Sequence, residues 1–202
     1  MHWTDTWYGY LVANYDHTVF ARGARVLDLG LGSGDQMRAL RTRGCWTVGV
    51  DIDRRAVAAA AAAGLGALVA RGEELPFRTG AFDGVVSKVV LPYTDEARAV
   101  AEIARVLRPG GECELSVHGA GYYLAYLVTS PSLRRRIYAL RTLLNTWLYA
   151  LTGTRRVGDT IYQTLPRLRR YFACQGLAVA RAVHGPPFLG VPVFVHVRLR
   201  RT

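Results

Sequence analysis

Residues 24–34 read ARVLDLGLGSG, in which a short apolar run gives way to glycine at every second position. Such a run is typical of a strand buried on both faces of a parallel sheet. Glycines after the strand let the backbone approach a ligand closely, and a helix that follows offers free N–H groups in its first turn. The stretch therefore predicts a strand, a ligand-binding turn and a helix over about residues 35–43.

The alternation of strand and helix continues to about residue 118. The hydrophobic pattern predicts further strands at residues 46–52, 67–70, 82–87 and 112–118, and further helices at 53–63 and 94–107. Asp53 suits the start of the first of these helices, and Gly64 its end. Strands that alternate with helices over short connections indicate an open parallel sheet with helices on both faces.

The last third departs from this rhythm. A helix is predicted at 165–174, followed by strands at 177–184 and 191–199, which we expect to pair antiparallel at the sheet edge. In the second strand, period two places five apolar residues on one face: Val191, Val193, Val195, Val197 and Leu199.

Two helices, at 121–129 and 132–151 and broken at Pro131, form an insertion after the fifth strand. The expected fold is a Rossmann-like α/β fold: a seven-stranded, mostly parallel sheet with helices on both faces, an antiparallel last strand and a helical lid. We expect a single domain over residues 1–202, composed of an N-terminal cap segment (1–22), a ligand-binding core (24–118), the lid insertion (119–162) and the last helix with the edge strands (163–202).

The glycine turn lacks the dinucleotide-binding fingerprint G-x-G-x-x-G, because Asp35 stands where the last glycine is needed. Its pattern is Asp-x-Gly-x-Gly-x-Gly, with Asp28 two residues before the first glycine. A carboxylate there suits an ammonium group rather than a pyrophosphate. Asp51 closes the next strand, about where a carboxylate can accept both hydroxyls of a ribose.

Three more motifs follow: EELPF at residues 73–77, FDGVVS at 82–87 and ARVLRPGG at 104–111. Together with the glycine turn, they resemble in order and spacing the class I S-adenosylmethionine-dependent methyltransferases, especially the branch of quinone and natural-product methyltransferases. The resemblance covers residues 24–118. It implies an enzyme that binds S-adenosylmethionine, releases S-adenosylhomocysteine and uses no metal.

The resemblance also implies a set of cofactor-binding residues: Asp28, Gly30, Gly32, Gly34, Asp51, Ile52, Glu73, Ser87 and Lys88. The glycines would pass under the methionine part, whose ammonium group Asp28 would orient. Asp51 would hold the ribose diol and Ile52 would pack on the adenine, while Ser87 and Lys88 border the methionine. The family's aspartate that contacts the adenine amine is replaced by Arg71, which leaves Glu73 or a backbone group as its substitute.

The catalytic residues remain unassigned. Many members of the family carry a histidine pair where this chain has Pro92 and Tyr93. His118, at the end of the fifth strand, is the best-placed titratable alternative, although a lone histidine is more often structural. Tyr93 suits either the wall of the acceptor pocket or packing. A general base is needed only when the acceptor carries a proton of high pKa.

Both segments expected to roof the acceptor site are rich in aromatic residues. The candidate lid residues are Tyr8 and Tyr15 in the N-terminal segment and Tyr122 and Tyr123 in the insertion. Large flat side chains suit a hydrophobic or aromatic acceptor, and they equally suit packing of the lid helices onto the sheet. We therefore predict methyl transfer to a small lipophilic or aromatic molecule, as in a biosynthetic pathway.

The net charge of +11 gathers in one part of the chain. Residues 1–114 hold 13 basic and 14 acidic side chains, whereas residues 115–202 hold 13 basic residues and one acid. Such an excess fits an anionic lipid surface, nucleic acid, an acidic substrate or simply a solvated face. The predicted helix at 132–151 is amphipathic and begins with three arginines, which suits an anionic membrane surface.

Two other functions stay open. One is an RNA methyltransferase that contacts phosphates through the arginine-rich C-terminal third, although no RNA-binding module or Asn/Asp-Pro-Pro-Tyr motif is present. The other is a protein that binds the cofactor without catalysis. Fold alone does not choose among them.

Nothing in the sequence indicates export. The N-terminus lacks the basic-then-apolar plan of a signal peptide, and no run of about 18 apolar residues appears. Cys45, Cys113 and Cys174 are widely spaced and odd in number, so no disulfide framework or zinc site is expected. We expect a cytoplasmic protein, with attachment to the inner membrane face as the alternative.

Overall fold

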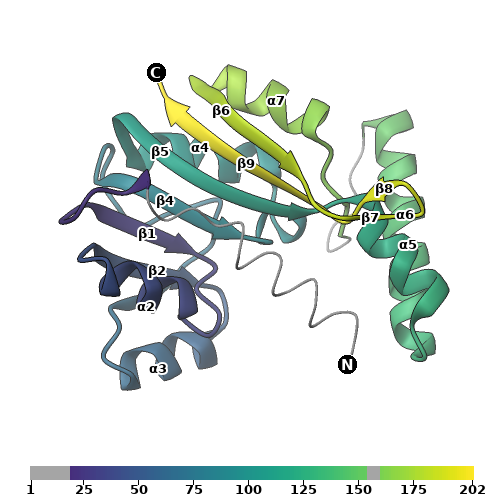
Figure 1. Ribbon diagram of the computed structural model, residues 1–202, viewed down its shortest axis with the longest axis horizontal. Helices are drawn as coiled ribbons and strands as arrows, with labels where there is room; N and C mark the ends of the chain where they lie inside the picture. The colour runs from purple at the N-terminus through teal and green to yellow at the C-terminus, as the bar shows by residue number, and fades with distance from the viewer. Residues whose placement is uncertain (1–18, 154–159) are drawn as a thin grey trace.

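The computed structural model describes residues 19–153 and 160–202 (Figure 1). The predicted lid residues Tyr8 and Tyr15, and most of the predicted cap segment, lie outside these described residues.

A seven-stranded sheet forms the centre, in the order β3-β2-β1-β4-β5-β9-β6. Its strands are β1 (Arg25–Leu29), β2 (Trp46–Asp51), β3 (Ala67–Val69), β4 (Phe82–Lys88), β5 (Leu107–His118), β6 (Leu177–His184) and β9 (Phe194–Arg201). The first five pair in parallel, and β9 is antiparallel to both of its neighbours. This confirms the predicted Rossmann-like fold and its antiparallel last strand, which lies between β5 and β6 while β6 forms the edge.

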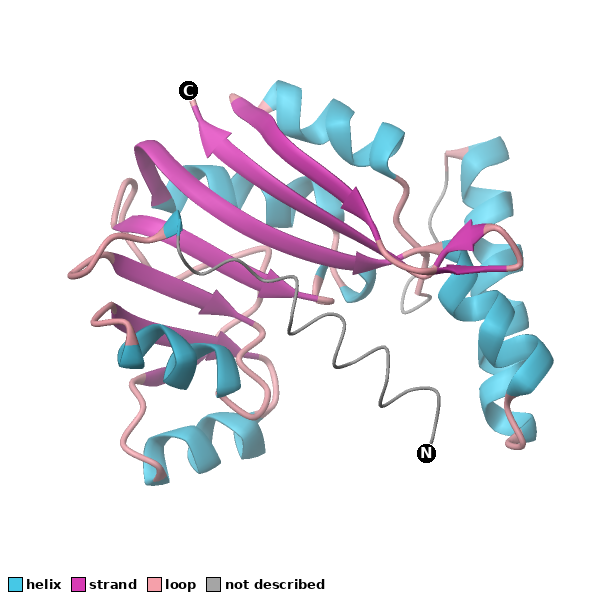
Figure 2. Cartoon of the chain, viewed as in Figure 1, coloured by secondary structure: helices cyan, strands magenta, loops and turns pink. Residues whose placement is uncertain are grey.

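Helices cover both faces of the sheet, as Figure 2 shows. They are α2 (Asp35–Thr42), α3 (Arg54–Ala62), α4 (Glu96–Val106) and α7 (Leu165–Cys174). Alternate residues of β1 face opposite layers: Val26 packs with Leu40 of α2, whereas Leu27 belongs to the main core with Ile103 of α4. The predicted cap of α3 is confirmed, because Asp53 accepts a hydrogen bond from the Arg55 N–H at 2.8 Å.

β5 begins at Leu107, five residues before the predicted start at residue 112. The Pro109-Gly110-Gly111 turn lies within the strand and bends it, instead of preceding it. Gly110 has φ +72°, and a Cβ on Gly111 would lie 2.9 Å from the Arg108 carbonyl oxygen and 3.1 Å from that of Asp83. The register of β4 against β5 shifts at the same place, between Phe82 and Gly84. Glycine thus lets β5 continue through a bulge that a side chain would block.

The predicted strand at 191–199 is wrong at its start. β8 (Val191–Pro192) pairs with β7 (Pro187–Phe188) in a separate two-stranded sheet, and β9 begins only at Phe194. Val195, Val197 and Leu199 share the core face as predicted, whereas Val191 belongs to the small hairpin. The hairpin packs on the start of the insertion, where a Cβ on Gly121 would lie 2.2 Å from the Val191 carbonyl oxygen.

Polar side chains on the face opposite α4 and α7 connect β9 to β5. The His196 ring lies 2.6 Å from the Ser116 hydroxyl through Nδ1 and 2.7 Å from the Glu114 carboxylate through Nε2. Arg198 Nε donates to the other Glu114 oxygen at 2.6 Å. The four residues form two directly paired rungs, Glu114 with Arg198 and Ser116 with His196, on the same face of the sheet, so one network joins β9 to β5.

The insertion consists of α5 (Ala120–Thr129) and α6 (Leu133–Thr152), which lie together at one end of the molecule (Figure 1). A short 3-10 helix, η2 (Leu91–Tyr93), follows β4. The buried residues of α6 are Ala139, Thr142, Asn145 and Thr146, so this helix turns small and polar side chains inward. No helix within residues 19–153 and 160–202 is long and apolar enough to cross a membrane.

Candidate functional site

A cavity of about 300 Å³ opens at the carboxyl ends of β1, β2 and β4. Open α/β sheets bind ligands at this edge, where the direction of strand addition reverses beside the first strand. Of the predicted cofactor residues, Gly30, Asp51, Ile52, Glu73 and Lys88 line the cavity. The predicted acceptor residue Tyr93 lines it too, together with Arg71.

The glycine turn contributes Gly30 to the cavity wall, whereas Gly32 lies outside that wall. Gly30 has φ +79°, and a Cβ there would lie 2.2 Å from Cγ2 of Val90. Gly32 also has positive φ, at +48°, but a Cβ on it would meet nothing within 4 Å among the described residues. Gly30 is therefore required by the protein's own packing, whereas Gly32 leaves space through which a ligand can approach the backbone.

Asp51 is held rigidly at the cavity wall. Its Oδ2 accepts from the Gly32 N–H at 3.0 Å, and its Oδ1 accepts from the Asp53 N–H at 2.9 Å. Each carboxylate oxygen keeps a further lone pair for a ligand hydroxyl. Beside it, the Ile52 side chain is 63% exposed although it is apolar, which is the surface that a flat ring would cover.

Asp28 lies under the turn, outside the cavity wall itself, and is only 1% exposed. Its Oδ2 has no hydrogen-bond partner among the residues that the structure describes. Burial, and then repulsion from Asp51, raise the pKa of Asp28 to about 7, against the opposing effect of Lys88. A cationic ligand nearby would favour the ionised form, so this carboxyl group is suited to an ammonium group.

Glu73 and Arg71 form the opposite wall. The Glu73 carboxylate accepts from the Asp95 N–H at 3.0 Å and lies 3.5 Å from the Arg71 guanidinium. These contacts fix Glu73 in the cavity wall. It is the residue predicted to substitute for the family's adenine-contacting aspartate, which Arg71 replaces. The exposed Arg71 side chain adds a solvated charge at the rim.

Lys88 lines the cavity at the end of β4, and burial lowers the pKa of its ammonium group. Ser87 is fully buried and pairs with Leu29 across the two strands, so it supports the turn from outside the cavity wall. Gly34 has no place in the wall either and serves as the N-cap of α2 in a left-handed conformation.

The structure does not bring His118 to the cavity wall. Its ring stacks on Tyr122 at 3.7 Å between centroids and meets the edge of Tyr123 at 6.0 Å. Burial lowers the pKa of His118 to about 3, so the imidazole is uncharged at neutral pH. The sequence could not show this, because the burial comes from α5 folding back over the end of β5.

Tyrosines extend from the cavity to the insertion. Burial and the neighbouring Tyr138 hydroxyl raise the pKa of Tyr93, so its phenol stays protonated at neutral pH. The Tyr122 hydroxyl donates to the Tyr126 hydroxyl at 2.9 Å. Tyr93 therefore connects the cavity rim to α6 through Tyr138, and it can donate a hydrogen bond but is no base.

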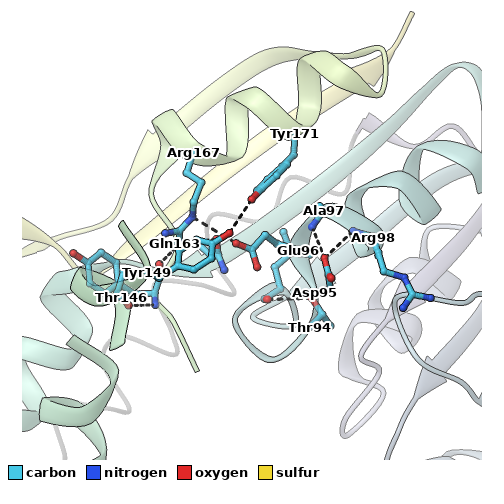
Figure 3. Close-up of polar contacts among 12 residues, drawn as sticks. Thr94, Asp95, Glu96, Ala97, Arg98, Thr146, Tyr149, Gln163, Arg167 and Tyr171 are labelled. Carbon is cyan, nitrogen blue, oxygen red and sulfur yellow. Dashed lines mark hydrogen bonds and ion pairs between the residues drawn. The ribbon is translucent and has the colours of Figure 1, made fainter. Parts of the chain in front are cut away.

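A buried ion pair, missed by the sequence reasoning, joins α7 to α4, and its arginine also contacts the lid insertion. Arg167 of α7 lies 3.6 Å from the Glu96 carboxylate of α4, with 15% and 4% of the two side chains exposed (Figure 3). The Arg167 guanidinium also donates to the Gln163 side chain and the Tyr162 carbonyl oxygen, and it lies over the Tyr149 ring of α6. Nothing in the residue spacing signals a pair that lies 71 positions apart.

Comparison with known proteins agrees with this geometry. Residues 27–115 match a family described as methyltransferase domain. The chain is similar to an uncharacterized methyltransferase of Mycobacterium tuberculosis, with 40% identity over 97 residues, which cover 47% of this chain and 40% of that protein. It is also similar to a demethylmenaquinone methyltransferase of Mycolicibacterium paratuberculosis, with 33% identity over 124 residues, 57% of this chain and 54% of that protein.

Among solved structures, the chain resembles an S-adenosylmethionine-dependent methyltransferase from Mesorhizobium loti. The TM-score is 0.69 at 22% identity, and the match covers 90% of this chain and 92% of that one. The likeness thus concerns the fold over almost the whole chain. The curated relatives are matched over only about half of their own length or less.

Proposed function

We propose that this chain, whose residues 27–115 match a methyltransferase domain, is a class I S-adenosylmethionine-dependent methyltransferase that methylates a small lipophilic or aromatic acceptor. The observation that carries this proposal is the Asp51 carboxylate. Two backbone N–H groups fix it at the cavity wall beside exposed Ile52.

The residues present fit S-adenosylmethionine. Asp51 would accept the ribose hydroxyls, Ile52 would cover one face of the adenine, and buried Asp28 would face the ammonium group. Glu73 would receive the adenine amine from the opposite wall. When bound, the cofactor supplies a methyl group on a positively charged sulfur. The open space at Gly32 lets the turn lie against the methionine part without a side chain between them.

The acceptor side favours positioning over acid–base chemistry. Tyr93 stays protonated and neutral His118 is a weak base remote from the cavity wall. Holding the two reactants in line in a dry pocket can by itself lower the barrier by several kcal/mol. The predicted lid residues Tyr122 and Tyr123 do not line the cavity and pack on His118 instead, so Tyr93 at the rim is the aromatic side chain that supports an apolar, flat acceptor.

The cofactor site is tested by Asp51→Ala with isothermal titration of S-adenosylhomocysteine. Loss of two charge-assisted hydrogen bonds should weaken affinity roughly ten- to a hundredfold. Asp53→Ala is the matched control, because its carboxylate caps α3 and lies outside the cavity wall. Equal weakening in both variants, or unchanged affinity in folded Asp51→Ala, would contradict the assignment.

The acceptor class is tested with labelled S-adenosylmethionine and an extract of the source cells. Label in the organic fraction supports the proposal. Label in RNA would favour the alternative function, whose support is the basic C-terminal third. Part of that charge is used inside the fold, however, since Arg167 contacts Glu96 and Arg198 contacts Glu114. Binding without any label transfer would favour a non-catalytic cofactor-binding protein.

A further inference from the structure

α6 exposes its apolar side. Seven large apolar residues recur at spacings of three and four along its whole length and form what we call the outer face of α6: Leu133, Ile137, Leu140, Leu144, Trp147, Leu148 and Leu151. Leu133 is 70% exposed, Trp147 59% and Leu151 65%. A continuous apolar surface of this kind on a globular protein marks a site of interaction.

The opposite side of α6 is fixed by polar contacts, so the helix cannot turn its outer face inward. The Thr146 hydroxyl accepts from the Tyr162 N–H at 3.0 Å, and Asn145 Nδ2 donates to the Thr160 carbonyl oxygen at 3.3 Å. Ala139 is fully buried on the same side. Rotation of the helix would break these contacts.

Within residues 119–153, the segment that carries the outer face, every charged side chain is positive. Residues 119–153 contain four arginines and no acidic residue, and Arg134, Arg135 and Arg136 at the start of α6 are exposed. A second copy of the chain seated on this face would bring the two arginine clusters into one interface, where like charges repel. An anionic lipid surface instead accepts both the leucine-rich face and the arginines.

We propose that the outer face of α6 docks this protein on anionic lipid bilayers. The helix would lie in the plane of the interface, with its leucines and Trp147 among the acyl chains and the exposed Arg134 beside them at the phosphates. In this arrangement α6 does not span the bilayer.

This inference deepens the proposed function, on which it rests for its link to catalysis. The inner side of the same helix carries Tyr138, which contacts Tyr93 at the rim of the cofactor cavity. The outer face of α6 would thus contact the bilayer while its inner side connects to the cavity rim. A lipophilic acceptor dissolved in the bilayer would therefore lie close to the cavity. Vesicle binding needs neither cofactor nor acceptor, so it can fail or succeed independently of methyl transfer.

The test is cosedimentation of the full chain with vesicles of phosphatidylcholine alone and of equal parts phosphatidylcholine and phosphatidylglycerol. We expect binding to the anionic vesicles that weakens as salt is added. Leu144→Ser with Trp147→Ser should lower the partition coefficient at least about tenfold, and Arg134→Glu about tenfold. The three side chains are exposed, so the variants should keep the affinity of the wild type for S-adenosylhomocysteine.

Trp46→Ser is the matched control, because Trp46 is 74% exposed at the start of β2, on the sheet rather than on the insertion. It should leave vesicle binding unchanged. Absence of binding to anionic vesicles overturns the proposal, as does an equal effect of Trp46→Ser. A dimer in sedimentation analysis that Leu144→Ser with Trp147→Ser dissociates would also overturn it, by assigning the outer face to a second copy.

Discussion

The glycine turn after β1 and the helix α6 differ in the kind of side chain that each presents for contact. In the turn, polar groups face inward and are held by the protein itself, as when Asp51 receives the N–H groups of Gly32 and Asp53. In α6, threonines and an asparagine are buried and leucines face outward. The first region thus presents fixed polar groups to the cavity, whereas the second presents an apolar surface to its surroundings.

The largest loss of stability should come from adding a side chain to the glycine turn. Gly30→Ala places a Cβ at positive φ and 2.2 Å from Val90, so we expect a loss of about 4 kcal/mol in the free energy of unfolding. Gly32→Ala meets no atom within 4 Å among the described residues, so it should cost about 1 kcal/mol through φ alone. Urea denaturation of both variants measures the difference. Equal losses would refute the idea that Gly30 serves packing and Gly32 serves the ligand.

The next effect should come from the connection between the two regions. Arg167→Ala leaves Glu96 buried without its ion-pair partner, which should lower the free energy of unfolding by about 3 kcal/mol. Arg169→Ala, on the exposed side of the same helix, should change it by less than about 0.5 kcal/mol. Similar stabilities of the two variants in thermal unfolding would show that the Glu96 pair does not hold the lid.

The smallest effect should be the pH dependence of Asp28. Its folded pKa of about 7 lies above the ordinary 3.8, so the folded state binds the proton more tightly than the unfolded chain does. This group therefore makes stability fall as pH rises from about 4 to 7, and Asp28→Asn should remove on the order of 2–3 kcal/mol of the fall between pH 5 and pH 8. Unfolding curves at pH 5 and pH 8 provide the measurement.

The same group predicts the pH dependence of binding. A ligand ammonium group requires ionised Asp28, so affinity for S-adenosylhomocysteine should decrease as pH falls below about 7. Asp28→Asn should bind weakly with no such dependence. A pH profile that is unchanged in the variant would place the ammonium group elsewhere.

The sequence predicted the first region better than the second. The spacing of Asp28, the glycines and Asp51 follows from the strand–turn–helix unit, because local backbone geometry fixes where such residues meet. The periodicity of α6 predicted an amphipathic helix, but a periodic pattern does not say which side packs inward. His118 failed to reach the cavity for the same reason, since its surroundings come from Tyr122 and Tyr123 on another element.

The position of β9 has a consequence for the order of folding. β6 precedes β9 in the chain but meets the rest of the sheet only through it, because β9 lies between β5 and β6. During synthesis on the ribosome, β6 therefore emerges with no sheet partner available. The edge of β5 also stays unpaired until β9 is made, because Glu114 and Ser116 contact His196 and Arg198 of that strand. Pairing of β9 with β5 is thus the long-range step that completes the sheet, and such pairings are intrinsically slow.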